Sequence, residues 1–366
     1  MLKRCSKLDG TVSKHIFNNI NTRWKVNLSF IIIIITSISA LGYVSFNMVL
    51  NAMVNHAREE SEMHISQIAT NIKVVLNGLD DIAKDVLDNK EFKECVRNYE
   101  NLTDFHMRAE SERIIEGVLK NRIRTRADIA DIAAVTNKGG YITSSEVKQR
   151  AGENGLSYYA IKMFKYSNKD SMWLDTYQSE VISTTTYTDN LLVISNIRSI
   201  KDAGNKDIGI LLLNVRESYL YNLVSEIVLP DNGQLFIIGR DGNYVMNTQE
   251  RNRNGKVDYS IYDLYLKEIL EFGNGSFIKE IDGEDYIIAC STIDEINGID
   301  LDWTVFGLTS VDLVTKEIKD ARENLFSIGI LCIAAAFFIT IIITNIHSFD
   351  SERKFNKKHA ILMERE

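Results

Sequence analysis

The chain has 366 residues, of which 45% are hydrophobic and 25% are charged, and its formal net charge is −8 at pH 7. This length suggests two or three domains with enough apolar sequence to bury a core. The acidic balance and the scattered basic residues give no reason to expect nucleic-acid binding.

The first predicted element is an apolar helix over residues 26–46, a stretch without charge or proline. Its 21 residues match the length that a helix needs to cross the hydrocarbon core of a membrane. The apolar run is longer than the core of a signal peptide, and no small-x-small cleavage site stands out after it. We therefore expect a retained transmembrane anchor rather than a cleaved signal peptide.

Helical sequence continues through residues 47–128. A heptad seam, in which apolar residues step alternately by three and four positions, is formed by Ile65, Ile68, Ile72, Val75, Leu79, Ile82 and Val86. The seam is typical of a contact between two chains, but it also fits one helix that buries this stripe against its own domain. Both alternatives stay open. A second helix is predicted over Asp104–Arg126.

The pattern then becomes that of strands, beginning with a predicted hairpin of Ile129–Thr136 and Tyr141–Ser144. A short helix is expected over Ser157–Tyr166. Strands follow over Met172–Thr176, Val181–Tyr187, Leu191–Ile200 and Asp207–Val215, and then a helix over Glu217–Val228. Residues 129–229 are thus predicted to form a first module.

Pro230 is the only proline, and we place the boundary between two modules there. The second module, residues 230–310, is predicted to contain a hairpin (Gln234–Gly239, Tyr244–Asn247), a helix (Ile261–Glu271) and three strands (Gly275–Ile281, Asp285–Ser291, Trp303–Thr309). The order of hairpin, helix and strands is the same in both modules. This predicts an internal structural repeat.

A connecting helix over residues 311–325 is predicted to run into a second transmembrane helix, residues 326–346. The tail that follows, residues 347–366, is about 20 residues long and too short to fold alone. The first tail, residues 1–25, carries the basic residues Lys3, Arg4, Lys7, Lys14, Arg23 and Lys25. Short basic flanks stay in the cytoplasm. We therefore expect a two-pass protein of the cell membrane with both tails in the cytoplasm and the intervening domain outside.

Of the four cysteines, only Cys95 and Cys290 fall in the predicted outer domain. A disulfide between them is one alternative, and two buried free thiols are the expected one.

A membrane helix, a long helix, two successive PAS-like modules and a second membrane helix together resemble the double Cache family of bacterial extracytoplasmic sensors. The stretches that carry this resemblance best are Asp207–Leu223, Gln234–Asn247 and Gly275–Ile288. The resemblance implies an α+β fold with two PAS-like modules on a long N-terminal helix. It also implies a ligand site in the module farther from the membrane, the first one. Such sensors occur in chemoreceptors, histidine kinases and diguanylate cyclases.

The amino-acid-binding members of the family use an Arg, a Trp-Tyr pair, a strand Tyr and an Asp. Here Tyr158 and Tyr159 match the aromatic pair, and Tyr177 matches the strand Tyr. Leu156 stands at the Arg position and Asn214 at the Asp position, so both charges of that site are missing. The sequence therefore argues against recognition of a free α-amino acid in that manner.

The remaining residues still predict a small-molecule site with aromatic walls and a few polar groups. The candidate residues are Tyr158, Tyr159, Trp173, Asp175, Tyr177, Thr185, Tyr187, Arg198 and Asn214. The alternative is that Trp173 and the tyrosines only pack over the sheet. Arg198 is the candidate for an anionic ligand, and its alternative is an ion pair with a carboxylate inside the protein.

No catalytic motif, metal-binding spacing or cofactor loop occurs in the sequence. We therefore predict a non-enzymatic sensor, without cofactor or metal, that binds a small solute and signals to a cytoplasmic partner. A contact through the heptad seam predicts a homodimer. One alternative is the sensory half of a histidine kinase or diguanylate cyclase. Another is a structural membrane protein with an empty Cache-like domain.

Overall fold

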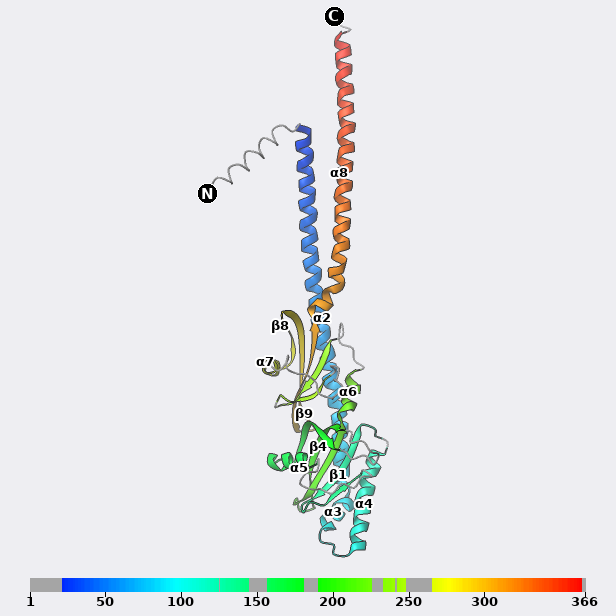
Figure 1. Cartoon of the computed structure of the whole chain (residues 1–366), viewed down its shortest axis with the longest axis vertical. Helices are drawn as coiled ribbons and strands as arrows, with labels where there is room; N and C mark the ends of the chain where they lie inside the picture. The colour runs from blue at the N-terminus through cyan, green and yellow to red at the C-terminus, as the bar shows by residue number, and fades with distance from the viewer. Residues whose placement is uncertain are drawn as a thin grey trace, which may run out of the picture. The chain divides into compact units, whose positions relative to one another are not determined.

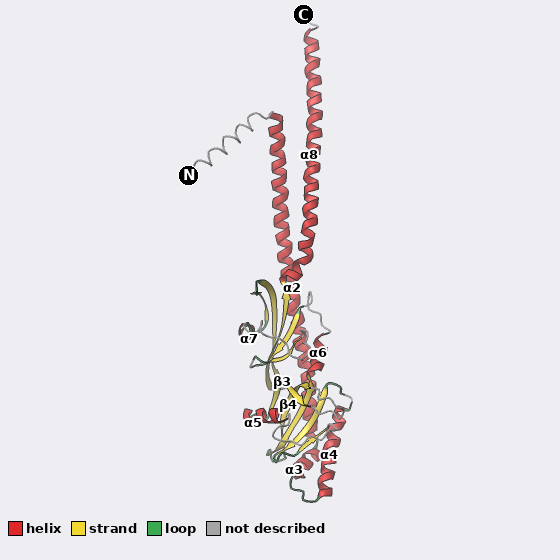
Figure 2. Cartoon of the chain, viewed as in Figure 1, coloured by secondary structure: helices red, strands yellow, loops and turns green. Residues whose placement is uncertain are grey.

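The computed structural model describes residues 22–124, 126–144, 157–180, 190–225, 233–240, 242–247 and 265–363 (Figure 1). It divides into two units, residues 55–314 and the combination of residues 1–54 with 315–366. Mixed helices and antiparallel sheets make up the larger unit, whereas the described part of the smaller one is helical (Figure 2).

The smaller unit contains the apolar parts of two long helices, α2 (Thr22–Asp88) and α8 (Val311–Met363). Each helix has an 18-residue stretch apolar enough to cross a membrane, with mean hydropathy of 2.0 and 2.7. Hydroxyl groups in these stretches bond to the backbone of their own helix. Thr36 Oγ1 donates to the carbonyl of Ile32 over 2.8 Å, and Thr340 Oγ1 to that of Ala336 over 2.7 Å. Such bonds satisfy polar groups where no water is present.

The first module is a five-stranded antiparallel sheet in the order β2-β1-β5-β4-β3. Its strands are β1 (Ile129–Thr136), β2 (Tyr141–Thr143), β3 (Ser171–Glu180), β4 (Asn190–Lys201) and β5 (Asp207–Arg216). Helix α5 (Ser157–Ser167) contacts one face of this sheet, and α6 (Glu217–Ser225) follows β5.

The second module repeats the same strand order, as β7-β6-β10-β9-β8. Its elements are β6 (Gln234–Ile238), β7 (Tyr244–Asn247), α7 (Leu266–Phe272), β8 (Gly275–Ile281), β9 (Glu284–Ile296) and β10 (Ile299–Ser310). The internal structural repeat predicted from the sequence is therefore confirmed.

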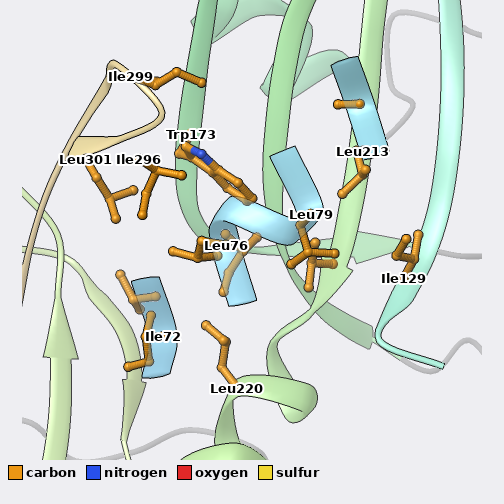
Figure 3. Close-up of a cluster of buried hydrophobic side chains, with 14 of the residues drawn as sticks. Ile72, Leu76, Leu79, Ile129, Trp173, Leu213, Leu220, Ile296, Ile299 and Leu301 are labelled. Atoms are coloured by element: carbon orange, nitrogen blue, oxygen red, sulfur yellow. The ribbon is translucent and has the colours of Figure 1, made fainter. Parts of the chain in front are cut away.

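Helix α2 supplies the core shared by the two sheets. Ile65, Ile68, Ile72, Leu79 and Val86 of the seam are fully buried, and Val75 and Ile82 are partly buried. They pack against side chains from both sheets, such as Leu213 and Ile296 (Figure 3). Complete burial of an aliphatic side chain contributes about 1.5–3 kcal/mol. Of the two alternatives for the seam, burial within one chain is therefore confirmed for residues 65–86, and the seam gives no support to a homodimer.

Two short helices follow α2. Helix α3 (Lys90–Tyr99) falls in the stretch 47–128 that was predicted to be helical, although no separate helix was predicted there. Helix α4 (Phe105–Ile123) lies inside the helix predicted over residues 104–126. Each begins at a side-chain cap: Asn89 Oδ1 accepts from the amide of Phe92, and Asp104 Oδ1 from that of His106. These caps satisfy amides that have no partner in the first helical turn.

Strand β3 differs from the prediction, because it runs without a break to Glu180. Its pairing with β4 shifts between Leu174 and Tyr177, which marks a bulge where the sequence had suggested that the strand ends. The predicted strand over residues 181–187, the boundary at Pro230 and residues 261–264 of the predicted helix lie outside the described part of the chain.

Cys95 and Cys290 are both free, so the expectation of two thiols is confirmed. Cys290 is buried, and its burial raises the pKa of the thiol to about 12. Cys95 is only half-buried, which is less than the sequence suggested, and burial raises the pKa of its thiol as well. Neither thiol is therefore poised to react as a thiolate.

Candidate functional site

Four polar side chains form a row across one face of the first sheet, the face that α5 partly covers. We call Tyr177 (β3), Ser195 (β4), Asn214 (β5) and Asp131 (β1) the polar row. Ser195 pairs with Asn214 in the register of β4 and β5, and Asn214 pairs with Asp131 in that of β5 and β1. Paired residues point to the same face of a sheet, so the folding of an antiparallel sheet brings these four together.

One half of the row is held by hydrogen bonds among neutral groups. The hydroxyls of Tyr177 and Ser195 lie 2.8 Å apart, and Ser195 Oγ donates to Asn214 Oδ1 over 2.6 Å. Tyr177 Oη lies 3.3 Å from the same Oδ1. Among the described residues, none accepts a hydrogen bond from Asn214 Nδ2. The Nδ2 group of Asn214 can therefore donate a hydrogen bond to a solute, while Ser195 and Tyr177 hold its Oδ1 atom in place.

The other half of the row is the carboxylate of Asp131, which is only 6% exposed. Three hydroxyls surround it. Tyr141 Oη donates to Oδ2 over 3.2 Å, Ser144 Oγ to Oδ1 over 2.9 Å, and Thr143 Oγ1 to Oδ1 as well. Within the described residues, no group of three or more His, Cys, Asp or Glu side chains could hold a metal ion. The row thus offers a solute hydroxyl and amide groups for hydrogen bonds and one carboxylate.

Tyr159 of α5 extends the row with an aromatic surface. Its ring centroid lies 5.5 Å from that of Tyr177, at a tilt of 50°. Both Tyr158 and Tyr159 are about half exposed, so their rings remain available to a solute. Burial raises the pKa of Tyr177 to about 12, so its hydroxyl stays protonated and can both donate and accept near neutral pH.

Helix α5 is fixed in place by apolar contacts on the same face of the sheet. Ala160 and Phe164 are buried against Leu174, Ile197 and Leu212. The face thus has an apolar part under the helix and a polar part beside it. This combination is common in sites that bind small molecules.

Trp173 does not belong to this face. It is 6% exposed and packs in the core near α2 with Leu76, Ile296 and Ile299 (Figure 3). The alternative that it is a packing residue is therefore confirmed. In a regular strand, residues 173, 175 and 177 would point the same way. The bulge between Leu174 and Tyr177 breaks this alternation.

Asp175 is turned toward the second module rather than toward the row. Its Oδ1 accepts a hydrogen bond of 2.8 Å from Trp303 Nε1 on β10. The next residue, Thr176, donates from Oγ1 to the carbonyl of Val245 over 2.6 Å. A Cβ atom added at Gly239 would lie 2.0 Å from the Asp175 carboxylate, so the two modules approach closely here. The bulge of β3 is therefore a joint between the modules.

Arg198 lies on the opposite face from the row, where it pairs with Asp80 of α2. This corrects its assignment to an anionic ligand, and the alternative of an internal ion pair holds. We call Asp80, Lys84, Asn196, Arg198 and Asn297 the Asp80 cluster. Asn196 and Asn297 donate to Asp80 over 3.1 and 2.9 Å, and Lys84 Nζ lies 2.9 Å from it. The cluster joins α2, β4 and the turn between β9 and β10.

The sequence-predicted site is thus brought together in part. Tyr159, Tyr177 and Asn214 converge, with Tyr158 beside Tyr159 on α5, whereas Trp173, Asp175 and Arg198 face elsewhere. Thr185 and Tyr187 lie outside the described residues. Sequence reasoning missed Ser195 and Asp131. Asp131 could have been noticed as the one charged residue in the apolar strand IADIAAVT.

Comparisons with solved structures show the same fold at low sequence identity. The periplasmic sensory domain of the Campylobacter jejuni chemoreceptor Tlp1 has a TM-score of 0.52 and 15% identity, with 72% of this chain and 98% of that one covered. The ligand-binding domain of the Campylobacter jejuni chemoreceptor Tlp3 in complex with L-norvaline has a TM-score of 0.51 and 15% identity, with 72% and 95% covered. Another structure of the Tlp3 sensory domain has a TM-score of 0.51 and 14% identity, with 74% of this chain and 99% of that one covered.

A search of curated proteins finds no sequence that matches the chain. In contrast, a protein-family model described as "Cache domain" matches residues 49–318, which is more than half of the chain. The matched region contains both five-stranded modules and the buried seam of α2. The chain therefore belongs to the Cache domain family, as the resemblance of its sequence implied.

Proposed function

We propose that the protein is a membrane-anchored, non-enzymatic sensor that binds a small solute in its first module and passes the signal across the membrane. The observation that carries this proposal is the polar row beside the exposed ring of Tyr159, in a Cache module whose chain continues on both sides into apolar helices. Assembly as a homodimer and a cytoplasmic signalling partner belong to the same proposal and stay predictions.

The proposed topology places both termini in the cytoplasm and residues 47–325 outside. It is supported by the two apolar helix stretches and by the basic residues of the first tail. Protease added to intact cells is expected to cleave the outer domain, while an epitope tag at either terminus stays protected until the cells are opened. Degradation of a terminal tag in intact cells, with the domain spared, would contradict this topology.

The proposed ligand is a small solute that lies against Tyr159 and Tyr177 and bonds to polar groups of the row. The Tlp3 domain that shares this fold was solved with L-norvaline, an amino acid. In the present chain Asn214 and Leu156 replace the charged residues of the amino-acid-binding members, so the way in which the solute is held must differ.

Two substitutions test the site directly. We expect Tyr159→Ala and Tyr177→Phe each to weaken solute binding several-fold, because the first removes an aromatic contact of about 0.5–1.5 kcal/mol and the second a hydroxyl of the row. The measurement is the thermal shift of the purified full chain with amino acids, carboxylates, amines and nucleobases. Tyr166→Ala is the matched control, since this tyrosine lies on the same helix, is 76% exposed and has its ring beside Lys162 rather than beside the row.

One outcome would contradict a ligand-binding role, and another would contradict the location of the site. If no solute class changes the melting temperature, and if both tyrosines can be replaced without effect, the structural interpretation of an empty Cache-like domain is favoured. If Tyr166→Ala weakens binding as much as Tyr159→Ala, the solute lies elsewhere on α5.

The joint at the bulge of β3 suggests how the signal leaves the first module. Tyr177 belongs to the row, and the two residues before it contact the second module through Trp303 and Val245. Trp303 is part of β10, which ends at Ser310, and α8 begins at the next residue. A solute that displaces Tyr177 would therefore act on the strand that leads directly into α8. Such a switch requires the solute to prefer one of two states.

A further inference from the structure

The row contains a buried carboxylate, Asp131, that no cation of the described residues balances. The structure buries three aspartates among the residues that it describes, Asp80, Asp128 and Asp131. Asp80 pairs with Arg198 and Lys84, and Asp128 pairs with Arg126 over 2.6 Å. Asp131 has no Lys or Arg within ion-pairing distance among the described residues, and its three partners are hydroxyls.

Hydroxyl donors stabilise a carboxylate by charge-assisted hydrogen bonds, but they leave its net charge in place. A charge that is removed from water is costly unless an opposite charge accompanies it. Arg126 and Arg198 show that this fold pairs its other buried aspartates in that way. The exception at Asp131 coincides with the face that carries Asn214, Tyr177 and the exposed ring of Tyr159.

The surroundings of Asp131 are suited to a positive group. Its neighbour Asn214 is neutral, so no second carboxylate of the row competes for the same charge. Tyrosine rings attract cations through their electron-rich faces, and the site has Tyr159 and Tyr177 in contact with each other and Tyr141 beside the carboxylate. Carboxylate and aromatic rings together are a common arrangement for binding ammonium groups.

We propose that the first module binds a small organic cation, a solute with a protonated or quaternary nitrogen, whose charge pairs with the Asp131 carboxylate. This inference rests on the proposed ligand-binding function and adds the chemical class of the ligand. The row contains no arginine or lysine that could pair with a carboxylate of the ligand. The ligand therefore needs no carboxylate in order to bind there.

The test compares solutes of equal shape and different charge on the purified full chain in an uncharged detergent. The probes are alkylamines of two to six carbons and choline, each set against the alcohol and the carboxylate of the same chain length. We expect the amines to raise the melting temperature and the matched carboxylates to leave it unchanged. Affinities are then measured by calorimetry for the amine with the largest shift.

Asp131→Asn keeps the shape and a hydrogen-bond acceptor but removes the charge. We expect it to weaken amine binding about tenfold or more, since the charge-assisted contact is lost. Asp207→Asn is the matched control, because it removes the same charge from an exposed position of β5. It is expected to change the affinity less than twofold. If Asp131→Asn does not fold, the comparison of amine, alcohol and carboxylate on the unmodified protein decides alone.

The outcomes separate this inference from the function on which it rests. Binding of alcohols or carboxylates that depends on Tyr159 and Tyr177, with amines inactive, rejects the cation and retains the sensor site. Amine binding that Asp131→Asn leaves unchanged also rejects the pairing with Asp131. If no probe binds and no solute of the wider screen binds, both the site and its preference for cations are rejected.

Discussion

Asp80→Ala is expected to lower the free energy of unfolding of the 55–314 unit by about 3 kcal/mol. The carboxylate is fully buried and accepts hydrogen bonds from Arg198, Asn196 and Asn297. Its removal leaves the guanidinium of Arg198, whose side chain is only 15% exposed, without its buried partner. Denaturant unfolding followed by tryptophan fluorescence measures the loss, because Trp173 and Trp303 are buried in this unit.

The control for this substitution is Asp81→Ala, one position along α2. The Asp81 side chain is 68% exposed and lies 3.6 Å from Lys84, so its ion pair is worth under about 1 kcal/mol. An equal loss of stability in the two variants would contradict the importance of the buried cluster and point instead to a general effect of charge on α2.

The effect of Asp80 also has a defined dependence on pH. Burial alone raises the pKa of Asp80, but hydrogen bonds from Asn297, Arg198 and Lys84 outweigh it and hold the pKa below the ordinary value of 3.8. A lowered pKa in the folded state means that the carboxylate stabilises the fold fully above the unfolded pKa of about 3.9. The contribution is lost as the pH falls through the lower, folded value. The difference between wild type and Asp80→Ala should therefore be constant from pH 7 to 5 and narrow below pH about 4.

Trp303→Ala is expected to destabilise the same unit by about 3–5 kcal/mol, since it removes a fully buried aromatic side chain and leaves a cavity. It also removes the hydrogen bond to Asp175 at the joint between the modules. Trp303→Phe keeps much of the aromatic volume but loses the Nε1 donor, so it should cost about 1–3 kcal/mol. The free energy of unfolding of each variant is measured by denaturant unfolding, followed by circular dichroism.

The two Trp303 variants also test the proposed route of the signal. Trp303→Phe should bind solute with nearly unchanged affinity, because the polar row is intact, while the response of α8 to the solute is reduced. That response can be followed by the change in protease cleavage within α8 on addition of the solute. A full response in Trp303→Phe would show that the bond to Asp175 is not needed for transmission.

Much of the fold was predictable because local patterns determine it. In the second half of each module, the apolar runs and the turn residues between them predicted the strands to within a few residues. The repeated order of elements predicted two similar sheets. Helix α3 was not distinguished from α2 within the predicted helical stretch, because only a single non-helical position, Asn89, separates the two helices. The hydrogen bond of its cap could not be seen in the sequence.

The site was predictable only where strand alternation is regular. Tyr177 and Asn214 were proposed from the family pattern, and their side chains lie within 3.3 Å of each other. Trp173 and Asp175 were predicted to share a site with Tyr177, and in a regular strand all three would lie on one face. The bulge between Leu174 and Tyr177 breaks this alternation. For Arg198 the sequence left an anionic ligand and an internal carboxylate as alternatives, because its partner Asp80 is more than a hundred residues away in the chain. Such distant partners are a product of folding and leave no local signal.

Strand β4 places the polar row one residue away from a contact with α2, a helix with a stretch apolar enough to cross a membrane. Ser195 belongs to the row on one side of the strand, and the adjacent residue, Asn196, donates to Asp80 of α2 on the other. A solute that displaces Ser195 would therefore displace Asn196 through the peptide bond that joins them. Because Asn196 bonds directly to Asp80, no further side chain is needed to transmit this displacement to α2.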